Sequence, residues 1–141
     1  MMYEADDALR QRMRVFISMA SPFGGHTGAA AGVKWSPVIA PVWWAMAPGS
    51  SYLQLIDGVD LSAGPSHHLV YTFSNEAGGE REEDDGVVTV ESQLAESAQR
   101  NATAVYGVAD NHVGVVTNAC TLALIPVILQ NATTPATASG C

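Results

Sequence analysis

Three short runs of β-branched and aromatic residues constrain the fold of this chain more than any other feature. They cover residues 14–20, 68–74 and 102–108. The first run is almost continuously apolar, which is typical of a strand buried on both faces in a parallel sheet. Segments long enough for helices separate the runs, so the chain is expected to alternate strands with helices. We predict an α/β fold with about three parallel strands and flanking helices.

Helices are expected after the second and third runs. Leu94 and Ala98 lie four residues apart in a predicted helix over residues 91–99. Thr117 or Asn118 is expected to cap a final helix that ends near Gln130. With 141 residues, we expect one domain over residues 1–130, followed by a mobile Thr, Ala, Pro, Ser and Gly tail over residues 131–141.

The segment over residues 26–60 differs from the rest and contains all three tryptophans of the chain, Trp35, Trp43 and Trp44. Several prolines and glycines interrupt it, so we expect an inserted, irregular, partly helical lobe. The tryptophans either fill core space or form a cap that binds an apolar substrate. The sequence leaves these two interpretations open.

Asp85 and His112 are the candidate catalytic residues. Asp85 precedes Gly86 and follows the second run, and His112 follows the third run. The carboxyl ends of parallel strands meet at one edge of a sheet, where α/β proteins place their sites. A carboxylate can orient an imidazole, which then acts as a general base. Asp84 is the alternative acid, and we favour Asp85 because glycine after it permits a sharp turn.

Other polar clusters give weaker predictions. His67 and His68 are adjacent in a strand, so their side chains should point to opposite faces and not share a metal ion. The acids that end at Asp85 suggest a solvated loop, with a Ca²⁺ site as the sharper alternative. They are Glu80, Glu82, Glu83, Asp84 and Asp85. We expect no metal site and no cofactor, since no ordered set of ligands is visible.

Composition excludes several classes of partner. The net charge is −8 with only 6 basic residues, which argues against nucleic acid as a partner. No apolar run reaches the length of a membrane span. Hydrophobic residues make up 48% of the chain, enough for a packed core. Cys120 is expected to be a core residue and not part of a disulfide framework.

Four segments carry a resemblance to a known family: residues 15–26, 46–53, 85–88 and 111–116. In this order they resemble segments of the lipase-like α/β-hydrolases. Residues 15–26 (VFISMASPFGGH) are similar to the strand and Ser-Pro-x-Gly-Gly stretch that follow the nucleophile helix in that family. Residues 46–53 (MAPGSSYL) resemble its cap segment. Residues 85–88 (DGVV) and 111–116 (NHVGVV) resemble its acid and histidine segments.

The resemblance implies a serine esterase or lipase that acts on an apolar ester or lipid without a cofactor. Asp85 would be the acid of its catalytic triad and His112 the base. No Gly-x-Ser-x-Gly nucleophile motif occurs between Met1 and Cys141. We therefore expect a carboxyl-terminal half that is inactive alone and that associates with a missing amino-terminal half or with itself. The alternative is a non-catalytic module that binds an apolar ligand or a partner.

Overall fold

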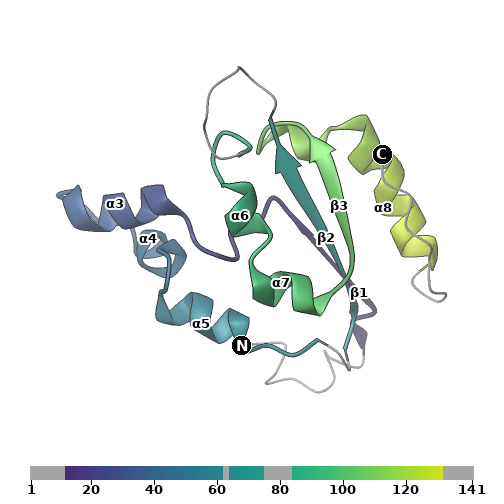
Figure 1. Cartoon of the computed structure of the whole chain (residues 1–141), viewed down its shortest axis with the longest axis horizontal. Coiled ribbons are helices and arrows are strands. Elements are labelled where there is room, and N and C mark those ends of the chain that lie inside the picture. Colours follow the sequence, from purple (N-terminus) through teal and green to yellow (C-terminus); the bar gives the residue numbers. More distant parts are fainter. Residues whose placement is uncertain (1–11, 62–63, 75–83, 132–141) are drawn as a thin grey trace.

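Three parallel strands form one sheet in the order β1-β2-β3 (Figure 1). The computed structural model describes residues 12–61, 64–74 and 84–131. The strands are β1 (Val15–Met19), β2 (Ser66–Phe73) and β3 (Ala102–Ala109). β2 lies in the centre and pairs in parallel with both neighbours. The predicted α/β class, with a three-strand parallel sheet and flanking helices, is confirmed.

The strands differ in burial because only β2 is paired on both sides. Five of its eight residues, including Leu69 and Val70, are buried. β1 was predicted to be buried on both faces, and this is wrong for its outer part, since Phe16 is 38% exposed. β1 lies at an edge of the sheet, and the face around Phe16 opens into a cavity. Apolar atoms of β1 are therefore exposed both at the sheet edge and toward the cavity.

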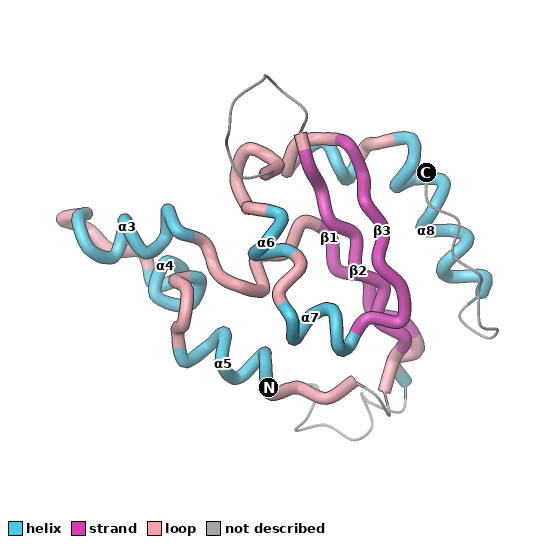
Figure 2. Tube along the Cα trace, viewed as in Figure 1, coloured by secondary structure: helices cyan, strands magenta, loops and turns pink. Residues whose placement is uncertain are grey.

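Helix α8 (Ala119–Asn131) packs on one face of the sheet (Figure 2). Asn118 caps it as expected, because the Asn118 Oδ1 accepts a hydrogen bond from the Cys120 amide at 2.8 Å. Cys120 packs against the core, and it is also disulfide-bonded, which the sequence analysis did not predict. The buried cluster on this face comes from strands, loops and helix together: Ala20, Val70, Tyr106, Val108, Val115 and Ile128.

Two short helices lie on the opposite side of the sheet from α8 (Figure 2). They are α6 (Val90–Gln93) and α7 (Glu96–Asn101), where one helix over residues 91–99 was predicted. The helix breaks because Leu94 leaves the α-helical region with φ −97° and ψ 32°. The break lets Asn101 reach the segment over residues 59–61, where its side chain donates to the Val59 carbonyl at 2.8 Å and accepts from the Leu61 amide at 3.1 Å.

The Trp- and Pro-rich segment forms a lobe of three short helices that extends away from the sheet (Figure 1). They are α3 (Thr27–Trp35), α4 (Pro41–Met46) and α5 (Ser51–Asp57). Each begins at a recognisable start signal: the His26 side chain caps α3, Pro41 is the first residue of α4 and the Ser50 hydroxyl caps α5. The lobe is therefore more regular than the sequence predicted.

Some predictions concern residues outside the described ranges. The tail after Asn131 and the acids from Glu80 to Glu83 are among them. Within the described ranges, no helix is long and apolar enough to cross a bilayer. In the same ranges, no group of three or more His, Cys, Asp or Glu side chains could hold a metal ion.

Candidate functional site

A hydrogen-bonded pair, Asp85 and His112, lies at the carboxyl ends of β2 and β3. The His112 Nδ1 is 2.8 Å from the Asp85 Oδ2, although 27 residues separate them in the chain. A second bond joins their backbones, from the His112 amide to the Asp85 carbonyl at 2.9 Å. The carboxylate is fully buried, while the His112 side chain is 32% exposed. The structure therefore brings together the two residues that the sequence analysis singled out.

The Asp85 side chain is fixed by a tight turn over residues 85–88. The Asp85 Oδ1 accepts the amides of Val87 and Val88 at 3.0 and 2.7 Å, and the Asp85 amide donates to the Val88 carbonyl. Gly86 has φ +89°, a left-handed conformation that glycine adopts without strain. The glycine after the acid thus has the role expected from the sequence.

The loop after β3 holds His112 through its two polar neighbours. The Asn111 Oδ1 accepts the amides of Val113 and Gly114, which forms a turn around the histidine. Asp110 accepts from Asn118 at 2.8 Å and so ties this loop to the start of α8. A single 3₁₀ turn, η1 (Gly114–Val116), follows. The imidazole is therefore held by a structured loop.

Hydrogen bonds keep the Asp85 carboxylate ionised despite its burial. Burial alone would raise the pKa of this carboxyl, because a charge is costly away from water. Bonds from Thr72, Val88, His112 and Val87 outweigh that effect and hold the pKa below its ordinary value of 3.8. An ionised carboxylate only accepts hydrogen bonds, so the proton in the contact with His112 belongs to Nδ1. In a neutral imidazole, Nε2 then carries the lone pair.

Asp84, the alternative acid, lies outside this pair. Among the described residues, its Oδ1 accepts only the nearby Gly86 amide, at 2.9 Å, and its backbone carbonyl accepts from Ser74. Asp85 is the acid whose carboxylate contacts the imidazole. The two acids therefore differ sharply in environment although they are adjacent in sequence.

The three tryptophans belong to the α3–α4 lobe. Trp35 and Trp44 are 76% and 58% exposed, and Trp43 is half-buried against Gly32. A Cβ atom at position 32 would come within 2.7 Å of the Trp43 ring, so glycine permits this close packing of α3 on α4. Neither interpretation of the tryptophans describes all three, since one packs within the lobe and two face solvent.

Two polar residues near Asp85 were missed by the sequence analysis. Thr72 is completely buried and its hydroxyl donates to the Asp85 Oδ2 at 2.6 Å. Gln93 is 1% exposed, and its side chain contacts Thr72, Val88 and Asp85. In the sequence, Thr72 interrupts the apolar run of residues 69–73, whereas Gln93 looks like any polar residue of a helix, and nothing local indicates the partners of either.

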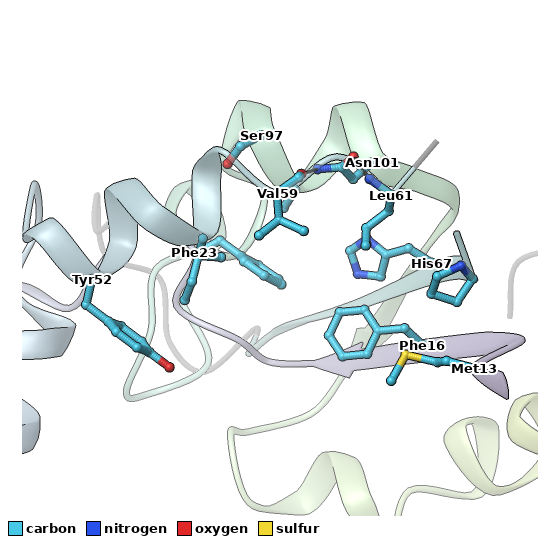
Figure 3. Close-up of a pocket in the computed structure, with 12 residues that line it drawn as sticks. Met13, Phe16, Phe23, Tyr52, Val59, Leu61, His67, Ser97 and Asn101 are labelled. Carbon is cyan, nitrogen blue, oxygen red and sulfur yellow. Dashed lines mark hydrogen bonds between the residues drawn. The ribbon is translucent and has the colours of Figure 1, made fainter. Parts of the chain in front are cut away.

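An apolar cavity of about 550 Å³ lies between the sheet and helices α5 and α7 (Figure 3). Phe16 of β1, Phe23 of the following loop and His67 of β2 converge on it, and Tyr52 lies at one side (Figure 3). Neither Asp85 nor His112 lines it, nor does any of the three tryptophans. The cavity and the hydrogen-bonded pair are thus separate features.

His67 and His68 point to opposite faces of β2, as predicted. The His67 ring stacks on Phe16 at 4.9 Å and bonds the Ser18 hydroxyl, whereas His68 bonds the Tyr106 hydroxyl on the other face. Burial, with a smaller contribution from His68, lowers the pKa of His67 from 6.5 to about 4. His67 is therefore a neutral core side chain at neutral pH.

Comparisons with known proteins add no relatives to this description. No protein family, no curated protein and no solved structure matches the chain.

The buried histidines make stability depend on pH. The unfolded chain takes up a proton at His67 below pH 6.5, but the folded chain does so only near pH 4. Stability should therefore fall as pH drops from 6.5 to 4, by roughly 3 kcal/mol for this residue. Burial lowers the pKa of His68 in the same direction. His67→Gln keeps a polar partner for Ser18 without titrating, so its unfolding free energy should fall less over this range.

Urea unfolding at several pH values measures this difference. Above pH 7, the unfolding free energies of wild type and His67→Gln should change with pH in parallel. Equal losses of stability for wild type and His67→Gln between pH 6.5 and 4 would show that His67 is not desolvated as described.

Proposed function

We propose that this chain supplies the acid and the general base of a serine-type carboxylic-ester hydrolase. The observation that carries the proposal is the contact between a buried, ionised Asp85 and the Nδ1 of a partly exposed His112. This contact leaves Nε2 to accept a proton from an attacking hydroxyl, and the carboxylate then stabilises the imidazolium that forms. The four segments that resemble lipase-like α/β-hydrolases support the same interpretation.

The nucleophilic hydroxyl is proposed to come from polypeptide outside the described residues. Hydroxyls near this end of the sheet already donate elsewhere: Ser92 to the Gly25 carbonyl at 2.6 Å and Ser74 to the Asp84 carbonyl at 3.1 Å. Within the described residues, the hydrogen bonds of His112 all go to Asp85. A hydroxyl that reaches Nε2 would complete the catalytic group.

The outer edge of β1 is the surface proposed to meet that polypeptide. Among the described residues it has no strand beside it, and its backbone groups can pair with an added strand. An amino-terminal half that carries the nucleophile, or a second copy of the chain, would cover the edge. The substrate is proposed to be an apolar ester or a lipid.

Ester hydrolysis tests the proposal, with p-nitrophenyl butyrate as the substrate. The rate of hydrolysis by the 141-residue chain should not exceed the background rate. The longest product of the reading frame that contains it should hydrolyse the ester. In that product, His112→Ala should lower kcat/KM by roughly 10³-fold or more, and Asp85→Asn should lower kcat by roughly 10⁴-fold, the loss seen in other triads of this kind.

Asp84→Asn is the matched control, because Asp84 is adjacent to the acid but does not contact the imidazole. It should change kcat/KM by less than about twofold, as expected of a residue that makes no contact with the reacting groups. An active enzyme that is indifferent to His112→Ala, or one in which Asp84→Asn is as damaging as Asp85→Asn, would contradict the assignment.

The cavity favours a second candidate function, a non-catalytic module for an apolar ligand. Its volume of about 550 Å³ lies within the range of small-molecule sites, and its walls are mainly apolar. The exposed Trp35 and Trp44 offer a different apolar surface for a ligand or a partner. These two surfaces can be distinguished by substitution.

Binding of the neutral fluorophore N-phenyl-1-naphthylamine separates them. If the cavity binds it, Val59→Trp should weaken binding at least tenfold by filling the space that Val59 lines, while Trp44→Ala leaves affinity unchanged. The reverse pattern would assign binding to the tryptophan lobe. No binding by the folded protein would remove the ligand-binding candidate for both surfaces.

A further inference from the structure

The end of strand β2 has an unusual partner. Ala20 donates to the Val70 carbonyl at 3.0 Å, so the backbone groups of Val70 face β1. Backbone directions repeat every second residue along a strand, so those of Thr72 face the same side. At Ala20, however, φ is +48° and the chain turns out of the sheet. The backbone N–H and C=O of Thr72 therefore point to the β1 side at a level where β1 has already ended.

The Gln93 side chain takes the place that β1 leaves. Its Oε1 accepts the Thr72 amide at 2.8 Å, and its Nε2 donates to the Thr72 carbonyl at 3.0 Å. These contacts fix the orientation of the amide group, because a reversed amide would face an N–H donor with its own NH₂. Gln93 thus pairs with β2 as a neighbouring strand would.

Gln93 also joins the strand to the turn that carries the acid. Its Nε2 donates to the Val88 carbonyl at 3.1 Å and lies 3.3 Å from the Asp85 Oδ2. The same Val88 carbonyl accepts the Asp85 amide. One buried side chain therefore ties the end of β2, the turn and the carboxylate to helix α6.

Thr72 completes this arrangement. Its single hydroxyl proton has two acceptors in range, the Asp85 Oδ2 at 2.6 Å and the Gln93 Oε1 at 3.2 Å. The shorter contact goes to the charged acceptor, which binds a proton donor more strongly. That oxygen is also the one that the His112 Nδ1 contacts. Thr72 therefore acts on the atom that orients the imidazole.

We propose that Thr72 and Gln93 are positioning residues for the Asp85–His112 pair: Thr72 donates to the carboxylate oxygen that contacts the imidazole, and Gln93 holds the turn that carries Asp85 against the end of β2. The proposal deepens the proposed function and rests on it for the catalytic role of the pair. The contacts that it invokes all lie within the chain, around the Asp85–His112 pair. It can therefore be tested on the chain without an ester or a nucleophile.

The test compares Thr72→Val with Thr72→Ser by NMR. Valine has nearly the shape of threonine but no hydroxyl, and serine restores the donor. Thr72→Val should raise the Asp85 pKa, read from its carboxyl carbon, by about one unit, because the ionised carboxylate loses a charge-assisted hydrogen bond. It should also lower the intensity of the downfield NMR signal of the His112 Nδ1 proton. Thr72→Ser should restore both readouts.

Gln93→Leu tests the second residue at similar volume. It should speed hydrogen exchange at the Thr72 amide at least tenfold and weaken the His112 Nδ1 proton signal. If Gln93→Leu does not fold, Thr72→Val and Thr72→Ser still decide the role of the hydroxyl. Gln93→Asn, whose side chain is too short to span both contacts, then replaces Gln93→Leu in the exchange measurement.

A folded Thr72→Val protein with an unchanged Asp85 pKa and an unchanged His112 proton signal would overturn the role of Thr72. Unchanged exchange at Thr72 in both Gln93 variants would overturn the role of Gln93. Neither outcome depends on hydrolysis, so failure of this proposal and failure of the proposed function are distinguishable.

Discussion

The structure around the candidate site depends on the burial of one charge, the Asp85 carboxylate. A buried carboxylate without partners would be protonated, because its desolvation costs more than the fold can supply. Here the Asp85 oxygens accept the amides of Val87 and Val88, the Thr72 hydroxyl and the His112 Nδ1. The turn, the end of β2 and the loop after β3 each contribute a donor. The charge therefore links three parts of the chain that are distant in sequence.

The features predicted from sequence were those that neighbouring residues determine. Residues 68–74 and 102–108 form β2 and β3 to within two residues at each end, because β-branched residues between helical segments identify buried strands. Gly86 marked the turn after the acid, and Asn118 marked the start of α8. The proximity of Asp85 and His112 followed from the topology, since parallel strands end at one edge.

The remaining features depend on contacts between distant residues. Gln93 bonds Thr72 across 21 residues, and no local pattern distinguishes it from an ordinary helical glutamine. Phe16 was expected to be buried, but it lines a cavity at the sheet edge that only the packing of α5 and α7 reveals. The tryptophans were treated as one group, whereas Trp43 packs on Gly32 while Trp35 and Trp44 face solvent.

The most direct test is to determine which nitrogen of the neutral His112 ring carries the proton. Nitrogen-15 NMR of the histidine side chains at neutral pH distinguishes a proton on Nδ1 from one on Nε2. An ionised Asp85 beside Nδ1 predicts that the neutral ring of His112 carries its proton on Nδ1 and that Asp85→Asn changes this preference. A neutral ring with its proton on Nε2, unaffected by Asp85→Asn, would contradict the central claim that this carboxylate prepares the imidazole to act as a base.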